Sequence, residues 1–436
     1  MALTGRTALL AALGALVVGL LLPSVTGIAA VTGAVLLAVL TDLVLAAPVR
    51  SLRITRGGDT SVRLGEPATV ELTVTNPSGR LLRGRLRDAW APSAWRPGTE
   101  IAASRHVLRI PGGERRRVTT VLTPTRRGDH HARKVTVRSL GPLGLAGRQG
   151  SHLVPWAVRA LPAFDSRKHL PSRLARLREL DGRTSVLTRG QGTEFDSLRE
   201  YLPGDDVRSI DWRASARRNT VAIRTWRPER DRHILIVLDT GRTSAGRVGD
   251  APRLDASLDA ALLLTALATR AGDRVDLLAH DLRKRASVAG RSPSEILPAF
   301  TSAMALLEPA LYETDMRSLV STALTMAPHR SLIVLLTGLD AAPVEDGLLP
   351  LLPLLTKRHE VVLASVADPR LDELATGRGT VEAVYGAAAA EQTRADRRLT
   401  ADRLTRHGVT VLDAPPTAVA PALADAYLAL KAAGRL

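Results

Sequence analysis

The sequence of 436 residues contains no cysteine and very few aromatic residues. Without thiols the chain forms no disulfide bonds and no thiolate metal sites, so we expect its soluble part in a reducing compartment or free of any need for covalent cross-links. It also lacks a G-x-x-x-x-G-K-[ST] phosphate loop, a G-x-S-x-G nucleophile elbow and an H-E-x-x-H helix. These absences remove the usual signatures of nucleotide hydrolysis, esterase chemistry and zinc-dependent proteolysis.

Positive charge is concentrated in one part of the chain. The net charge is +17, of which residues 50–165 carry +13, whereas residues 233–436 carry −2. A nucleic-acid-binding surface would combine such basic residues with stacking aromatics on one face. Here the arginines alternate along strand-like stretches with few aromatics among them, so we expect no nucleic-acid partner and attribute the charge to a nearby membrane.

Two apolar runs precede the basic region, at residues 8–22 and 27–47, and Pro23 and Ser24 separate them. A membrane span needs about 20 apolar residues, with a range of about 17–25. The second run meets this requirement, and the first meets it if its flanks lie among the lipid headgroups. A cleavable signal peptide is the alternative, but the second run would still span. We therefore predict a transmembrane helical hairpin over residues 1–49.

The flanking charges predict the orientation of this hairpin. Arg50, Arg53 and Arg56 follow the second run, whereas the loop between the runs has no charge. Basic residues favour the cytoplasmic side, so both ends of the hairpin and the soluble domains should be cytoplasmic. This predicts a multi-pass protein of the inner or plasma membrane. Asp42, the only charge within the runs, should reach the membrane interface.

Residues 50–165 read as an all-β domain. Residues 68–76, 117–123 and 134–138 alternate apolar and polar side chains, as half-buried strands do, and glycine and proline turns fall between them. Short strands at this spacing predict an immunoglobulin-like β-sandwich.

Residues 166–232 combine a connector helix, expected at 170–181, with a charged segment at 188–232 in which arginines and carboxylates interleave around a few aromatics. Arginine binds carboxylates with two parallel hydrogen bonds, so this spacing predicts a partly buried ion-pair network. Catalysis is the weaker hypothesis, since the segment has no His, Cys or Lys and paired carboxylates stay ionised. The expected network pairs Arg199, Arg208, Arg213 and Arg217 with Glu200, Asp205, Asp206 and Asp211, over a buried Trp212.

The spacing of the charged segment resembles the signature of the domain of unknown function 58 family. The matching residues, which we take as a candidate interaction surface, include Phe195, Arg199, Tyr201, Gly204, Asp205, Asp206, Arg208, Asp211, Trp212 and Arg217. The resemblance implies a membrane hairpin, a β-rich domain, this signature and then a von Willebrand factor A-like domain. It also implies a partner, an AAA+ ATPase of the MoxR type. It implies no established activity.

Residues 233–436 alternate apolar strands with helices, which predicts a doubly wound, mostly parallel α/β sheet. Asp239 ends the first strand, where such sheets place their ligands. The von Willebrand factor A resemblance implies a Mg²⁺ site there, formed by Asp239, Thr243 and, from a second loop, Thr314. Gly241 stands where that pattern has Ser, and Gly338 where it has Asp. We therefore predict a degenerate site in a domain that serves as a rigid docking surface, with no cofactor; Mg²⁺ bound at the degenerate site is the alternative.

The leading functional hypothesis is a membrane-anchored, cytoplasm-facing adaptor rather than an enzyme. By resemblance it would partner a MoxR-type AAA+ ATPase, and other envelope proteins, in the assembly or maturation of envelope complexes. The alternative is a metal-assisted hydrolase whose carboxylates are Asp205, Asp206, Asp211 and Asp239.

Overall fold

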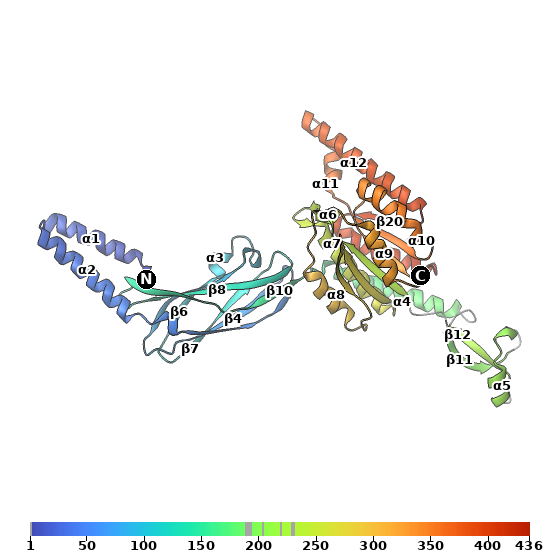
Figure 1. Ribbon diagram of the computed structural model, residues 1–436, viewed down its shortest axis with the longest axis horizontal. Helices are drawn as coiled ribbons and strands as arrows, with labels where there is room; N and C mark the ends of the chain where they lie inside the picture. Colours follow the sequence, from blue (N-terminus) through green and yellow to red (C-terminus); the bar gives the residue numbers. More distant parts are fainter. Residues whose placement is uncertain (1, 188–193, 203–204, 219, 228–231) are drawn as a thin grey trace. The chain divides into compact units, whose positions relative to one another are not determined.

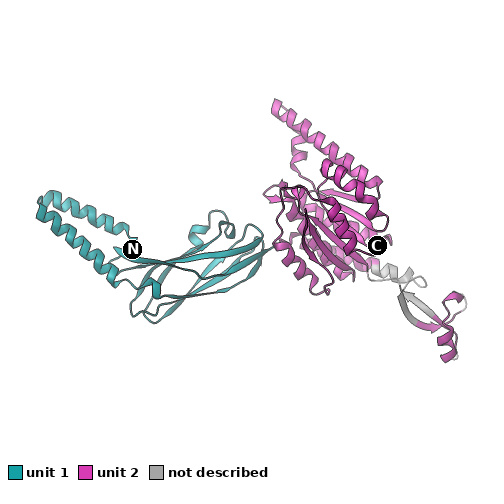
Figure 2. Cartoon of the chain, in the orientation of Figure 1, with its two compact units in different colours: residues 1–161 teal, residues 162–436 magenta. Residues whose placement is uncertain are grey.

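The computed structural model describes residues 2–187, 194–202, 205–218, 220–227 and 232–436, with the backbone alone at 181–187, 194–197, 218 and 224–227. Contacts divide the chain into two compact units, residues 1–161 and 162–436 (Figure 2). The four-part division expected from the sequence, at 1–49, 50–165, 166–232 and 233–436, remains a prediction.

The first unit begins with a helical hairpin of α1 (Gly5–Leu21) and α2 (Val25–Leu45) (Figure 1). Pro23 interrupts the chain between them, and the Ser24 hydroxyl accepts a hydrogen bond from the Gly27 N–H at 3.1 Å to begin α2. Among the described residues, one helical segment, Val25–Ser51, is long and apolar enough to cross a membrane by length and composition, while α1 is shorter. An apolar segment near the N-terminus that could anchor the chain is therefore present.

A β-sandwich follows the hairpin. Its smaller sheet has the order β2-β4-β7, and its larger sheet has the order β1-β9-β8-β10-β3, with β5 pairing to β8 and β6 pairing to β5. The strands are β1 (Ala2–Leu3), β2 (Arg53–Gly58), β3 (Ser61–Arg63), β4 (Ala68–Thr75), β5 (Leu82–Trp90), β6 (Arg105–Ile110), β7 (Arg115–Leu122), β8 (Gly128–Leu140), β9 (Ala146–His152) and β10 (Ala157–Leu161).

Alternation of side chains builds this sandwich. Along β5, Leu82 and Leu86 are buried while Arg83 and Arg85 are exposed. Inward residues of both sheets, such as Leu72 of the smaller one, form a common core. A sheet-rich domain is thus confirmed where the sequence predicted one, and the immunoglobulin-like topology remains a prediction.

The second unit is built on a six-stranded sheet of order β17-β16-β13-β18-β19-β20, parallel except for β17. Its strands are β13 (His233–Asp239), β16 (Arg274–His280), β17 (Lys284–Val288), β18 (Leu332–Leu336), β19 (Glu360–Val366) and β20 (Val409–Ala414). Its principal helices are α4 (Leu170–Leu187), α7 (Arg253–Arg270), α8 (Ile296–Ala305), α9 (Met316–Met326), α10 (Leu352–Thr356), α11 (Arg370–Ala375), α12 (Val381–Arg406) and α13 (Pro416–Ala432).

Both faces of this sheet are covered. In β13, Ile234 and Ile236 join a core with residues of α7, α8 and α13, while Leu235 and Val237 join a second core with residues of α9 and α10. The predicted doubly wound α/β sheet is confirmed. The connector helix α4 contributes Leu177 to the first core, so it belongs to this unit.

The charged segment forms a small antiparallel pair of its own, β11 (Glu194–Glu200) with β12 (Ala222–Arg227). A 3-10 turn, η4 (Val207–Ser209), and the short helix α5 (Trp212–Arg218) lie between these strands. The charged segment is therefore a hairpin with a helical insertion.

Candidate functional site

The strand order of the α/β sheet reverses next to β13. After β13 the chain passes to β16 on one side and then to β18 on the other. At such a switch point the loops leaving the carboxyl ends of two strands diverge and open a crevice that commonly binds ligands. Asp239 is the last residue of β13, as the sequence predicted, so it lies at this crevice.

Asp239 is 2% exposed and its carboxylate is enclosed by hydrogen-bond donors. One oxygen, Oδ1, accepts from the Gly241 N–H at 2.8 Å and from the Thr314 hydroxyl. The other, Oδ2, accepts from the Thr243 hydroxyl at 2.9 Å and the Thr337 hydroxyl at 2.5 Å. The structure brings together the three predicted residues, Asp239, Thr243 and Thr314. Thr337 was missed as a member, although it follows β18 directly and could have been expected at this edge.

The residues of this cluster do not fit the Mg²⁺ site that the resemblance implies. Hydroxyl and carboxylate oxygens suit Mg²⁺, but the cluster holds one carboxylate, and four donors already bind it. A Cβ at Gly241 would lie 2.1 Å from Thr314 Oγ1, and one at Gly338 would lie 3.0 Å from Asp340 Oδ2. The two missing ligands therefore cannot be restored without moving their neighbours.

Two ion pairs flank the Asp239 cluster. Arg242 forms an ion pair with Glu313 at 2.6 Å, and both side chains are exposed. Asp340 lies 3.6 Å from Arg253. Each charge near Asp239 thus has a partner of its own, and the Asp239 carboxylate is stabilised by neutral donors.

A second buried carboxylate, Asp281, follows the neighbouring strand β16. It pairs with Arg285 at 2.7 Å and accepts from the Thr240 hydroxyl at 3.3 Å and from the Tyr312 hydroxyl at 3.4 Å. Sequence reasoning did not select Asp281, although it stands directly after an apolar strand as Asp239 does. Together the two carboxylates fix the loops at this edge of the sheet.

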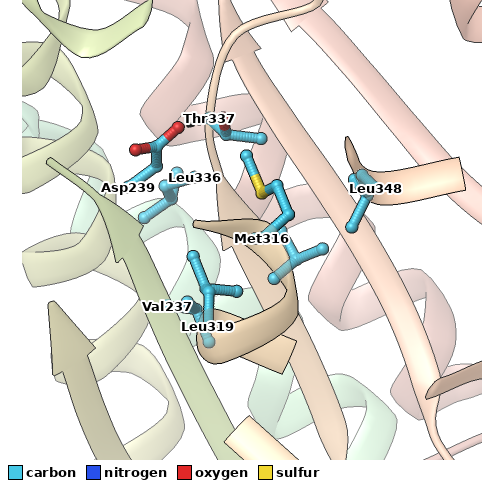
Figure 3. A pocket seen from close by; sticks show the side chains of 8 residues that line it. Val237, Asp239, Met316, Leu319, Leu336, Thr337 and Leu348 are labelled. Atoms are coloured by element: carbon cyan, nitrogen blue, oxygen red, sulfur yellow. Dashed lines mark hydrogen bonds between the residues drawn. The ribbon is translucent and has the colours of Figure 1, made fainter. Parts of the chain in front are cut away.

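The crevice beneath Asp239 is small. A pocket of about 220 Å³, including its mouth, lies between Asp239, Thr337 and the apolar side chains of Met316 and Leu348 (Figure 3). Small-molecule sites usually gather several convergent polar groups, whereas the polar lining residues here are Asp239 and Thr337, and four donors already bind Asp239. A substrate pocket is therefore not indicated here.

The rim of the same edge is apolar and exposed. Leu311 is 82% exposed, and its neighbour Tyr312 is exposed as well. The Tyr312 hydroxyl donates to Asp281, and Leu282, the residue after Asp281, is also exposed. The Tyr312 carbonyl accepts a hydrogen bond from the Arg242 N–H at 2.9 Å, which ties this rim to the loop of the Asp239 cluster. Exposed apolar groups on a rigid edge are typical of protein-binding surfaces.

The charged segment contains one of the predicted ion pairs, at its surface. Arg199 binds both carboxylate oxygens of Asp205, at 2.6 and 2.7 Å. This guanidinium, helped by the Leu202 N–H, holds the pKa of Asp205 below its usual range. Asp205 therefore stays ionised and is not a proton donor.

The other carboxylates of the segment organise its turns. Asp206 accepts from the Arg208 N–H at the start of η4. Asp211 accepts from the Arg213 and Ala214 N–H groups at the start of α5, each at 3.0 Å. These are N-cap contacts, in which each carboxylate binds backbone N–H groups of the turn that it begins.

The expected burial of the segment is wrong at Trp212, which is 69% exposed. Arg208 and Arg217 are exposed as well, and Tyr201 is half-buried, its N–H donating to the Val221 carbonyl at 2.8 Å. Trp212 is the first residue of α5, a helix of seven residues. Gly204 and the side chain of Phe195 lie outside the described residues.

The hydrolase alternative required carboxylates that act together. Asp205, Asp206 and Asp211 bind, respectively, an arginine and two turns, and Asp239 is enclosed by its own donors. Among the described residues no group of three or more His, Cys, Asp or Glu side chains could hold a metal ion. No observation favours the hydrolase.

Residues 197–408 match the family model described as "Protein of unknown function DUF58". The uncharacterized protein Rv1480 of Mycobacterium tuberculosis is 26% identical over 187 residues, which cover 42% of this chain and 58% of that protein. The uncharacterized protein YeaD of Bacillus subtilis is 25% identical over 113 residues, 26% of this chain and 28% of that protein. The chain thus spans 58% of the length of the mycobacterial relative it matches.

Among solved structures, the CARDB domain of the PF1109 protein from Pyrococcus furiosus is similar over 25% of this chain and 92% of that domain. The sequence identity is 14% and the TM-score 0.19. A TM-score this low says nothing of function.

Proposed function

We propose that this chain, which belongs through residues 197–408 to the DUF58 family of proteins of unknown function, is a membrane-anchored adaptor that acts by binding other proteins. The family match covers the charged segment and most of the α/β unit, so the binding surface should lie there. Residues 1–49 would span the membrane twice, and the soluble domains would face the cytoplasm.

The observation that carries this proposal is the exposed apolar set on the charged segment. Leu202, Val207 and Trp212 are all exposed, although each is a residue type that proteins usually bury. Tryptophan is enriched among the residues that dominate binding energies at interfaces. The Arg199–Asp205 pair beside them holds charge in a fixed geometry, which favours selection of one partner over another.

The α/β unit would support this binding as a rigid platform. We interpret it as a von Willebrand factor A-like domain whose ligand edge has lost its metal set. The hydrogen-bonded Asp239 cluster holds the loops of that edge, and the exposed rim around Leu311 offers a second apolar contact. No catalytic role is proposed, because each carboxylate considered has a structural partner.

The proposed partner is an AAA+ ATPase of the MoxR type, and the proposed role is assembly or maturation of envelope complexes. This partner rests on the family resemblance. An apolar N-terminal segment and an exposed docking segment are the features by which the chain would recruit it to the membrane.

The test is binding of purified full-length protein, in detergent or nanodiscs, to a purified MoxR-type ATPase from the same organism. We expect Trp212→Ala to weaken binding by about 2 kcal/mol or more, as loss of a central interface tryptophan does. Tyr385→Ala, which removes another exposed aromatic on α12, is the matched control and should bind normally. Equal binding by wild type and Trp212→Ala would rule out the segment as the docking surface.

A further inference from the structure

The outward face of the larger sheet of the first unit carries a row of arginines. Three come from β5, two from β6 and one from β8, and all six are exposed. We call this surface the arginine face: Arg83, Arg85, Arg87, Arg105, Arg109 and Arg138.

The register of the strands places these arginines directly opposite one another. Arg83 pairs with Arg109 and Arg87 with Arg105 across β5 and β6, and Arg85 pairs with Arg138 across β5 and β8. Side chains directly opposite on antiparallel strands share a face and lie close together, and like charges there are destabilising. The fold therefore keeps three repulsive pairs on one surface.

The carboxylates of the first unit do little to offset this repulsion. Glu100 approaches Arg87 at 3.6 Å, and Arg138 donates to the neutral side chain of Gln149 at 3.0 and 3.1 Å. Other carboxylates of the unit are engaged elsewhere. Asp42 and Asp59 accept backbone N–H groups, while Glu71, Asp88 and Asp129 pair with Arg117, Arg56 and Arg159.

Protection of a sheet edge explains only part of the arginine face. β6 pairs with β5 alone in the described sheet, and charged side chains on such an edge strand deter pairing with other chains. That explanation covers Arg105 and Arg109. It does not cover the arginines of β5 and β8, which lie on strands with neighbours on both sides.

We infer that the arginine face binds an acidic segment of another protein. The planar guanidinium binds carboxylates with two parallel hydrogen bonds, so opposed arginines can each share an incoming Asp or Glu. Val107, 72% exposed and directly opposite Arg85, gives the centre of the face an apolar contact. An apolar centre with arginines around it is the usual composition of a protein interface.

Two other anionic partners fit this surface less well. Single-stranded nucleic acid binds by stacking on aromatic side chains, and the outward residues of β5, β6 and β8 named here include none. A lipid surface at the hairpin would contact only the end of the arginine face near Arg83. The hairpin joins the sheet near Leu140, the cross-strand neighbour of Arg83, and Arg87 lies about 13 Å further along β5. Lipid charge is screened over about 8 Å at physiological salt.

The arginine face lies in residues 83–138, outside the charged segment and the α/β unit to which the proposed function refers. Either proposal can therefore fail without the other.

The experiment uses full-length protein in nanodiscs of phosphatidylcholine. The probe is a fluorescent peptide that alternates glutamate with threonine around a central valine, and a peptide with glutamine for glutamate is its control. The test variant is Arg83→Gln/Arg85→Gln/Arg109→Gln. The matched variant is Arg115→Gln/Arg116→Gln/Arg117→Gln on β7 of the other sheet, which removes the same charge.

We expect the glutamate peptide to bind wild type and the β7 variant alike, with an affinity that falls as salt rises. The arginine-face variant should bind about tenfold or more weakly, and its thermal unfolding should be no earlier than that of wild type, since like-charge pairs are removed. Equal binding by the two variants, or by the two peptides, overturns the proposal. If anionic phosphatidylserine in the nanodisc abolishes peptide binding, the face belongs to the membrane and the proposal is also wrong.

Discussion

At the scale of one residue, Asp239 has a structural role at the edge of the sheet where α/β domains commonly bind ligands. Its carboxylate accepts one N–H and three threonine hydroxyls. Hydrogen bonds to a charged group contribute about 1.5–3 kcal/mol, and removing the acceptor leaves buried donors unpaired. We therefore expect Asp239→Ala to lower the unfolding free energy of the 162–436 fragment by about 3 kcal/mol, measured by thermal melting.

Added Mg²⁺ provides the control for that experiment. A ligand at about 100 times its dissociation constant would stabilise the folded state by about 2.7 kcal/mol. Because the cluster lacks the second carboxylate, we expect no shift of the melting temperature with Mg²⁺. A shift that Asp239→Ala abolishes would show that the cluster is a metal site.

His359 should make the stability of the second unit depend on pH. Its side chain is 5% exposed, and neither ring nitrogen has a hydrogen-bond partner among the described residues. Burial lowers the pKa of His359, and the nearby Arg358 and His233 lower it further. The unfolded chain, with a histidine pKa of about 6.5, therefore binds a proton more readily than the folded one.

The folded state therefore has its full stability above about pH 6.5, where His359 is neutral in both states. The free energy of unfolding decreases as the pH falls below that value, because the unfolded chain binds the proton first. We expect the denaturant midpoint of wild type to fall between about pH 7.5 and pH 5.5, and His359→Phe to reduce that fall. His407→Gln, which changes an exposed histidine of the same unit, should leave the pH dependence unchanged. The same pH dependence in His359→Phe as in wild type would assign it to other groups.

At the scale of an element, Asp42 joins helix α2 to the β-sandwich. It is fully buried and accepts the N–H groups of Leu143, Leu145 and Ala146 at 2.6–2.8 Å. The turn approaches so closely that a Cβ at Gly141 would lie 2.2 Å from Asp42 Oδ1. The sequence suggested that Asp42 reaches the membrane interface. In the structure it also caps a turn of the β-sandwich.

Asp42→Ala should therefore open that turn. We expect the amides of residues 143–146 to exchange with deuterium at least about tenfold faster, which corresponds to about 1.4 kcal/mol of lost protection. Thr41→Ala is the control, since the Thr41 hydroxyl donates to the Ala38 carbonyl within its own helix. Unchanged exchange in Asp42→Ala would mean that other contacts hold the turn.

The charged segment gives a second prediction at this scale. Asp211 is the N-cap of α5, so Asp211→Ala should destabilise the segment by about 1 kcal/mol. Arg208 is exposed, so Arg208→Gln should change the stability by less than about 0.5 kcal/mol. Thermal melting of the 162–436 fragment measures both. A loss of several kcal/mol in Arg208→Gln would instead support the buried ion-pair network predicted from the sequence.

The elements differ in how far the sequence could predict them. The unbroken apolar run of β13 and the helical periodicity of α9 predict the α/β sheet, because a strand buried on both faces must be apolar along its whole length. Two features are hard to read from the sequence. Helix α12 (Val381–Arg406) is rich in alanines, which give it helix propensity without a periodic apolar face. The edge strand β17, of sequence KRASV, has no apolar run.

The candidate site was predictable where contacts are local and not where they are distant. Asp239 and Thr243 follow one strand, so their proximity could be read from spacing. The partners of Asp42 lie about 100 residues away, and nothing in the local sequence specifies them. Trp212 was expected to be buried from its residue type alone, whereas burial depends on which surfaces pack against a side chain, and the residue type does not specify them.

At the scale of the whole molecule, two membrane crossings by the hairpin remain a prediction, since one described segment, Val25–Ser51, is long and apolar enough to span. Both outer ends of the hairpin touch the same turn: Thr4 donates to the Gly144 carbonyl at 2.7 Å, and Asp42 accepts from Leu145. Helix α1 is shorter, and many of its apolar side chains are exposed. The predicted second crossing would bury those side chains in lipid and leave both ends on one side.

The basic residues predict that this side is the cytoplasm. Arg56 is neutralised by Asp88 at 2.8 Å, but Arg50 and Arg53 remain exposed behind α2. We expect a reporter fused before residue 1 and a second one fused after residue 436 to be active in the cytoplasm, and external protease to leave both intact. Under a single crossing the two reporters would lie on opposite sides of the membrane. Activity of the C-terminal reporter outside the cytoplasm would overturn the orientation, because Arg50 and Arg53 would then lie on the non-cytoplasmic side of the membrane.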